Sequence, residues 1–325
     1  MTKSPDSILV LHEALSAEAR PDEADALDQV DVVSQSMREL GWSVSVLATG
    51  LELETTLASV AAAKPACVFN LVESLNRDGR LIHVVPALLS AAGVRFTGSG
   101  SDAMYLSSQK LLAKRWMRSH DIPTPGNFVP GEKKPAVKSK WIVKSVWEHA
   151  SFGLDDGCVV NNLAAARTRI DHCLAKHGGA WFAEHFIDGR EFNVSVLEID
   201  GQPRILPVAE MTFVDYPRGK PKIVGYSAKW DDTAPEFHST QRVFASLTAA
   251  ERDAINAVCY KCWRAFGVRG YARVDIRMDS HGVPWVLEVN ANPCLSPDGG
   301  FAAAAAEAGI SLTSVIESIV RAALN

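Results

Sequence analysis

Two carboxylates and one amide are the most informative side chains of this sequence. They lie on a predicted β-hairpin over residues 272–290, whose arms alternate apolar and polar residues. Closing the hairpin near His281-Gly282 would place Asp275 opposite Glu288, and Arg273 opposite Asn290. Carboxylate and amide oxygens suit a hard divalent cation, so the pattern predicts a metal site at Asp275, Glu288 and Asn290. The alternative is a solvated polar face, but the apolar run ends in Asn-Ala-Asn-Pro, which is unusual for one.

The alternation also predicts which side chains of the hairpin are buried. On each arm three apolar residues should share the inner face: Val274, Ile276 and Met278, then Trp285, Leu287 and Val289.

The elements that must position this hairpin indicate a mixed α/β (α+β) protein of three units. The first unit, 1–102, alternates strands at 7–11, 44–47 and 66–71 with helices at 25–40 and 81–92, which predicts a parallel sheet. It lacks G-x-G-x-x-G after the first strand, which argues against a plain dinucleotide fold. The second unit, 103–187, begins with a basic helix at 106–120 and continues with a strand at 141–144, a loop at 145–157, a helix at 163–177 and a strand at 181–187. The third unit, 188–325, contains a hairpin around Asp200-Gly201, the metal hairpin and a last helix at 312–324.

Composition excludes several classes of protein. The 325 residues carry a net charge of −5, which gives no electrostatic reason to bind nucleic acid or an anionic membrane. No apolar run approaches the ~20 residues that span a bilayer, and the first residues do not resemble a signal peptide. The six cysteines show no disulfide framework, and Cys259-x-x-Cys262 has no second pair to complete a zinc site. These features predict a cytoplasmic enzyme with buried free thiols.

The hairpin carries a resemblance to a known family. Tyr271-Ala-Arg-Val-Asp-Ile-Arg, Val286-Leu-Glu-Val-Asn-Ala-Asn-Pro and the helix that begins at Gly300-Phe301 resemble the metal-binding end of ATP-grasp ligases, above all D-alanine–D-alanine ligase and its relatives. The resemblance covers most of residues 66–325. It implies an ATP-grasp fold preceded by a parallel-sheet pre-ATP-grasp domain.

The same resemblance implies which residues hold the nucleotide. Lys110 and Lys144 match the family's phosphate lysines, and Ser151 lies in a loop that would close over the phosphates. Glu184 and Glu191 match the strand and bend that hold adenine and ribose. From the sequence alone, Lys144 is equally compatible with a solvated surface, and Glu184 with an exposed strand end. Lys110 alone is a weak signal, because basic helices are usually solvated.

The resemblance also implies the chemistry. A ligase of this family uses ATP to convert a carboxylate into an acyl phosphate, which an amine then attacks. Two Mg²⁺ ions, with Mn²⁺ as the alternative, would be held by the metal hairpin. Arg273 would stabilise the tetrahedral oxyanion, although an ion pair with Asp275 or Glu288 explains it too. Lys229 resembles the γ-phosphate lysine of a closing loop, and the tract 215–237 would form that lid.

The substrate residues are less well marked. Glu18 stands near the position of the family's ammonium-binding glutamate, although a solvated helix approach explains it equally. Gly299 replaces the serine that binds the acceptor's carboxylate, and the neighbouring Asp298 would repel that group. We therefore expect amino-acid or peptide substrates other than two D-alanines. The alternatives are a true D-alanine–D-alanine ligase and a non-catalytic ATP-binding regulatory protein, and a homodimer is left open.

Overall fold

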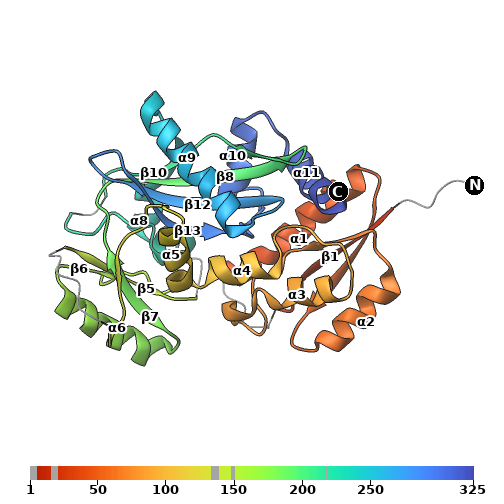
Figure 1. Cartoon of the computed structure of the whole chain (residues 1–325), viewed down its shortest axis with the longest axis horizontal. Coiled ribbons are helices and arrows are strands. Elements are labelled where there is room, and N and C mark those ends of the chain that lie inside the picture. Colours follow the sequence, from red (N-terminus) through yellow and green to blue (C-terminus); the bar gives the residue numbers. More distant parts are fainter. Residues whose placement is uncertain (1–5, 16–20, 133–138, 148–150, 217) are drawn as a thin grey trace, which may run out of the picture.

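Three β-sheets and the helices that cover them make up the part of the chain described by the computed structural model, residues 6–15, 21–132, 139–147, 151–216 and 218–325 (Figure 1). The first sheet is parallel throughout, in the order β2-β1-β3, as the alternation of strands and helices predicted. Its strands are β1 (Ser7–Glu13), β2 (Ser43–Thr49) and β3 (Cys67–Asn70), and its helices are α1 (Pro21–Glu39), α2 (Leu53–Ala63) and α3 (Val84–Ala91). Helix α2 was not predicted.

The second sheet is small and antiparallel, in the order β4-β7-β5-β6. It consists of β4 (Asn127–Phe128), β5 (Trp141–Ser145), β6 (Val159–Val160) and β7 (Trp181–His185), covered by α6 (Leu163–His177). The predicted basic helix is divided at Gln109 into α4 (Ser101–Ser108) and α5 (Lys110–Ser119). Gln109 is extended and caps α5 by accepting a hydrogen bond from the Leu112 amide, so Lys110 begins the new helix.

The third sheet carries the metal hairpin, in the order β11-β10-β8-β12-β13, with β9 paired to β8. Its strands are β8 (Arg190–Ile199), β9 (Gln202–Ile205), β10 (Ala209–Phe213), β11 (Thr240–Phe244), β12 (Tyr271–Met278) and β13 (Pro284–Asn290). The helices that accompany it are α7 (Tyr226–Trp230), α8 (Pro235–Ser239), α9 (Ala249–Phe266), α10 (Gly300–Glu307) and α11 (Leu312–Leu324). Cys259 and Cys262 are buried on α9.

The register of the hairpin is the predicted one, with Asp275 opposite Glu288 and Arg273 opposite Asn290. Two predicted burials, those of Trp285 and Leu287, are wrong, because both side chains are only partly buried. Because a bulge follows Asp275, Ile276 pairs with Val286, and Leu287 becomes an extra residue on β13. Val286 is therefore the fully buried side chain, and both Leu287 and Glu288 line the cavity.

One apolar core joins the two ends of the chain. Residues of β1 and α1 such as Ile8 and Val33 pack in the same buried cluster as Phe301 of α10 and Ile316 of α11. Figure 1 shows α11 beside α1 near the C-terminus. Leu27 of α1 does not join this core and is 47% exposed. The unit boundaries near residues 102 and 187 stay a prediction.

Among the described residues no single helix is long and apolar enough to cross a membrane. The pair α10 and α11 meets the length and composition criteria only when the two are taken together, and they are bent by 104°.

Candidate active site

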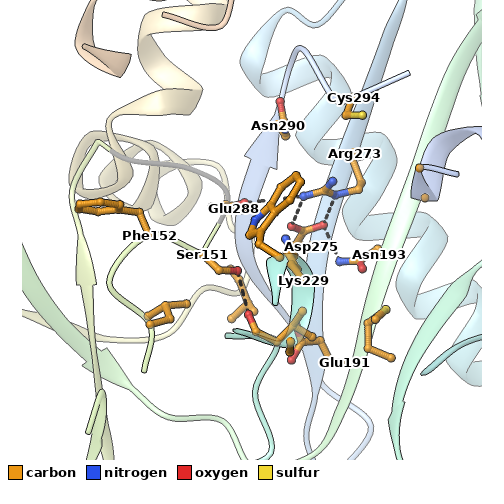
Figure 2. A pocket seen from close by; sticks show the side chains of 18 of the residues that line it. Ser151, Phe152, Glu191, Asn193, Lys229, Arg273, Asp275, Glu288, Asn290 and Cys294 are labelled. Carbon is orange, nitrogen blue, oxygen red and sulfur yellow. Dashed lines mark hydrogen bonds and ion pairs between the residues drawn. The ribbon is translucent and has the colours of Figure 1, made fainter. Parts of the chain in front are cut away.

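A cavity of about 400 Å³ lies over the face of the third sheet that carries the predicted metal ligands (Figure 2). Segments far apart in the sequence line it, from α1 and α5 to α7, which lies within the predicted lid, and the start of α10. Most of the predicted site residues are in its lining: Lys110, Lys144, Ser151, Glu191, Lys229, Arg273, Asp275, Glu288, Asn290, Asp298 and Gly299. Glu184 lines only a smaller adjoining cavity, and Glu18 lies outside the described residues.

Opposite charges are interleaved on the hairpin face. The Arg273 guanidinium donates to both Asp275 oxygens, with Nε to Oδ1 at 2.7 Å and Nη2 to Oδ2 at 2.9 Å. Asn193, opposite Asp275 on β8, donates to Oδ1 at 2.8 Å. Glu288 is flanked by Arg273 at 4.0 Å and by the Lys110 ammonium at 3.7 Å. The ion pair that sequence reasoning offered as the alternative role of Arg273 is therefore present.

Glu184 connects two lysines in the protein interior. Its carboxylate lies 2.5 Å from the Lys114 ammonium and 2.6 Å from the Lys144 ammonium, and its side chain is 1% exposed. Burial alone would favour the neutral carboxyl, but the two lysines overcome that effect and lower the pKa of Glu184. Burial likewise opposes the charge of Lys144, yet Glu184 raises its pKa, so Lys144 is held as a cation beside the cavity.

Glu191 lies where the main cavity meets the smaller one, which has a volume of about 50 Å³. Its carboxylate accepts two hydrogen bonds from Arg277, at 2.6 and 3.0 Å. Arg277 in turn stacks over the Phe186 ring at 4.9 Å. Much of the remaining lining is apolar: Ile142, Leu154, Ile187, Ile223, Val224 and Leu287. The small cavity is thus an apolar slot with charged groups at its edge.

Residues of the loop after β5, which was predicted to close over phosphate groups, contact the predicted lid directly. The Ser151 hydroxyl donates to the Val224 carbonyl at 2.8 Å, and the Tyr226 amide donates to the Leu154 carbonyl at 3.0 Å. Lys220 bridges the same two segments by pairing with Asp156 and Glu236. The loop after β5 and the segment around α7 therefore cover the cavity as one joined flap.

Lys229 reaches the cavity from α7, the helix within the predicted lid (Figure 2). Desolvation by the surrounding walls, followed by the positive charge of Arg273, lowers its pKa from the ordinary lysine value. A polyanion in the cavity would oppose both effects. A phosphate group bound in the cavity is therefore expected to favour the charged form of Lys229.

An acidic region forms the end of the cavity nearest α1. Asp25 accepts hydrogen bonds from the Ser296 hydroxyl at 2.6 Å and from the Cys294 thiol at 3.0 Å. Burial, together with Asp25, raises the pKa of Cys294 to about 12, so the thiol stays protonated. Burial, then the neighbouring Glu13, raises the pKa of Glu73 to about 8. The hydrogen bonds from Ser296 and Cys294 to Asp25 therefore attach the loop that follows the hairpin to helix α1.

The hairpin residues fit a divalent cation by their chemistry. Asp275, Glu288 and Asn290 offer only oxygen donors from one sheet face, and such a small set leaves positions for phosphate and water. No three His, Cys, Asp or Glu side chains gather into a metal-binding group anywhere in the described ranges. In the predicted set, the amide of Asn290 would be the third oxygen donor beside the two carboxylates.

Several residues of the site were missed by sequence reasoning. Lys114, Asn193, Arg277, Asp25 and Arg242 all contact or line it. Asn193 and Arg277 had a usable signal, because each lies two positions after a predicted site residue, Glu191 or Asp275, on the polar face of its predicted strand. The others, Lys114 and Asp25 on helices and Arg242 on an edge strand, are charged residues in positions that usually indicate a solvated surface.

Comparison with known proteins agrees with this architecture. Residues 129–321 match the family model described as D-ala D-ala ligase C-terminus. The chain is 30% identical to the uncharacterized protein y4sG of Sinorhizobium fredii, covering 89% of this chain and 85% of the relative. It is 27% identical to a D-alanine–D-alanine ligase of Methylacidiphilum infernorum, covering 91% of this chain and 89% of the relative. The structure of D-alanine–D-alanine ligase from Bacillus anthracis complexed with ATP superposes with a TM-score of 0.76 at 18% identity. The match covers 98% of this chain and 97% of the solved chain.

The fold is that of ATP-grasp enzymes, and one cavity gathers lysines and carboxylates from several segments of the chain. The chain belongs to the D-alanine–D-alanine ligase family and is an ATP-dependent carboxylate–amine ligase.

Proposed function

We propose that the protein joins the carboxylate of an amino acid or peptide to an amine, forming an acyl phosphate from ATP and releasing ADP and phosphate. One observation carries this proposal. A single cavity brings the facing carboxylates Asp275 and Glu288 together with lysines from three separate segments, Lys110, Lys144 and Lys229. Such an arrangement can neutralise and position several anionic groups at once.

For the nucleotide, the apolar slot beside Glu191 suits the adenine ring, and Lys110 and Lys144 would bind phosphates. Ser151 and the joined flap would close over them. The pairing of Glu184 with Lys114 and Lys144 supports a role in orienting Lys144 towards the nucleotide. The Glu191 carboxylate would give up part of its contact with Arg277 and accept hydrogen bonds from the ribose hydroxyls.

Two Mg²⁺ ions, or Mn²⁺ in their place, would be held by Asp275, Glu288 and Asn290. When bound, these ions neutralise phosphate oxygens and favour in-line transfer. Arg273 would orient the donor's carboxylate and then stabilise the oxyanion formed when the amine attacks. Lys229 would hold the γ-phosphate, while the flap excludes the water that would hydrolyse an acyl phosphate.

The substrates are proposed to be an amino-acid or peptide pair other than two D-alanines. Gly299 supplies no hydroxyl, and the exposed Asp298 adds negative charge to the same part of the cavity. Glu18 stays a candidate for the donor's ammonium. We also propose a cytoplasmic enzyme that acts on small molecules, either as a monomer or as a homodimer; the free cysteines fit a reducing compartment.

Phosphate release from ATP and Mg²⁺ tests the function, across a panel of L- and D-amino acids and dipeptides offered singly and in pairs. Product masses identify the bond formed. Release with a pair other than two D-alanines supports the proposal. Efficient D-alanyl-D-alanine formation at millimolar D-alanine, a usual range for KM, would establish the ordinary family activity instead. ATP binding without turnover on any pair would favour a regulatory protein.

A further inference from the structure

Arg242 has no role in the reaction as described so far, yet its side chain lines the cavity. It lies on the edge strand β11, opposite Met211 of β10. Its Nη2 donates to the Asp298 carbonyl at 3.1 Å. Within the described part of the chain, no carboxylate comes within ion-pairing distance of this guanidinium. Arg242 therefore brings a positive charge to the end of the cavity where sequence reasoning found only Asp298.

The start of α10 lies beside the same guanidinium. Arg242 Nη1 is 3.7 Å from the point where a β-carbon on Gly300 would stand. Gly299 is the N-cap of α10 and, as a glycine, brings no side chain to cap the first turn. The leading amides of a helix carry partial positive charge and need an acceptor. A guanidinium next to them completes a site for one carboxylate.

We propose that Arg242 binds the carboxylate of the acceptor substrate, and so selects amines that carry a carboxylate. This inference rests on the proposed ligase function and deepens it. Arg242 takes the part that the resemblance assigns to a serine hydroxyl, and its charge offsets Asp298. With Arg242 present, Gly299 and Asp298 therefore no longer exclude an acceptor that carries a carboxylate. A planar guanidinium can hold a carboxylate with two hydrogen bonds, which a hydroxyl cannot do. The acceptor class is therefore an α-amino acid or a short peptide with a free carboxylate.

The test compares each acceptor with its own carboxamide, which lacks the charge but keeps nearly the same shape. In the wild-type protein the acid should be the better acceptor. Arg242→Gln should raise KM for the acid roughly ten- to a hundredfold, with kcat and the KM for ATP close to wild type. The preference for acid over amide should largely disappear. Arg242→Lys should restore part of that preference, because it keeps the charge.

The matched control is Arg204→Gln, which changes an exposed strand arginine on β9 outside the cavity lining. It should leave the acid preference unchanged. If Arg242 only supported the Asp298 loop, Arg242→Gln would weaken acid and amide acceptors equally, which would overturn the proposal. So would equal use of acid and amide by the wild-type protein.

Calorimetry separates failure of this inference from failure of the proposed function. The probes are the panel of L- and D-amino acids and their amides, added to protein that contains ADP and Mg²⁺. Arg242-dependent binding of acids, without any phosphate release, would contradict the ligase function but support the carboxylate site. Turnover together with acid binding that does not depend on Arg242 would support the ligase function but contradict the carboxylate site. Absence of acid-selective binding and of acid-selective turnover would overturn the inference.

Discussion

Charged residues on the hairpin face form ion pairs with their neighbours and are also the proposed metal ligands. Glu288 lies among Lys110, Arg273 and the opposing Asp275, so its charge is balanced before any ligand binds. Removal of that charge would leave the shape of the strand unchanged. This property makes the role of the residue testable without unfolding the protein.

Glu288→Gln should lower kcat by roughly a hundredfold or more, because several kcal/mol of charge stabilisation would depend on the metal that it holds. Phosphate release at several Mg²⁺ concentrations measures the effect, and circular dichroism checks the fold. Glu307→Gln, an exposed residue on α10, is the control and should behave as wild type. Near-normal turnover of the Glu288 variant would remove Glu288 from the metal site.

Lys110→Ala and Lys144→Ala should each weaken ATP binding by about 1.5–3 kcal/mol, the range for hydrogen bonds to charged groups. Calorimetric titration with ATP and Mg²⁺ measures this loss, and Lys176→Ala on the exposed face of α6 is the control. Lys144→Ala also leaves Glu184 with Lys114 alone, so this variant should lose thermal stability as well. Unchanged affinity in both variants would contradict the nucleotide assignment.

Glu73 should make the free protein less stable as the pH rises. Its pKa is raised to about 8 by burial and by Glu13, so the folded protein binds a proton that the unfolded chain has already lost. Between the ordinary pKa of 4.5 and about 8, this group should lower the free energy of unfolding by at most ~1.4 kcal/mol per pH unit. Urea titrations of Glu73→Gln should show a flatter pH dependence. An identical pH profile in both proteins would exclude this effect.

At the scale of elements, two hydrogen bonds join the loop after β5 to the predicted lid, so we expect the two segments to move as one flap. The contacts are Ser151 to Val224 and Tyr226 to Leu154. The single glycine within the Ser151–Leu154 turn is Gly153, with φ of +72° and Trp181 directly beneath it. A β-carbon there would stand 2.4 Å from the Trp181 ring. Gly153 therefore sets how closely the flap packs on the second sheet.

Gly153→Ala should raise the KM for ATP and increase cleavage of the flap in limited proteolysis. The reasons are the left-handed backbone, at roughly 1–2 kcal/mol, and the overlap with Trp181. Gly179→Ala is a matched control, because Gly179 has nearly the same φ, +71°, but no atom within 4 Å of its β-carbon position. Equal effects of the two substitutions would mean that the Trp181 contact is unimportant.

At the scale of the whole molecule, the N-terminal sheet and the C-terminal helices share one core. Ile316 of α11 is fully buried in a cluster that includes Ile8 and Val33. The same packing brings Asp25 of α1 to Ser296, so it also shapes the substrate end of the cavity. The first unit therefore contributes to the site through Asp25 of α1.

Ile316→Ala should lower the free energy of unfolding by about 2–5 kcal/mol, as for other large-to-small core substitutions. Denaturation followed by fluorescence and by circular dichroism measures it. Leu27→Ala, at a position that is 47% exposed on α1, is the control and should have little effect. A normal stability for Ile316→Ala would show that the shared core contributes little.

The sequence by itself determined the local features: the hairpin register, the parallel first sheet and the bounds of α6 and α11. Those follow from alternation, helical periodicity and turn residues, which act over short distances along the chain. The bulge at Leu287 was not predictable, because alternation alone does not reveal an extra residue. Only the tertiary structure joined Lys114, Lys144 and Glu184, or placed Arg242 beside Gly300. Contacts between residues tens of positions apart depend on how the sheets and helices pack, and no local pattern encodes that packing.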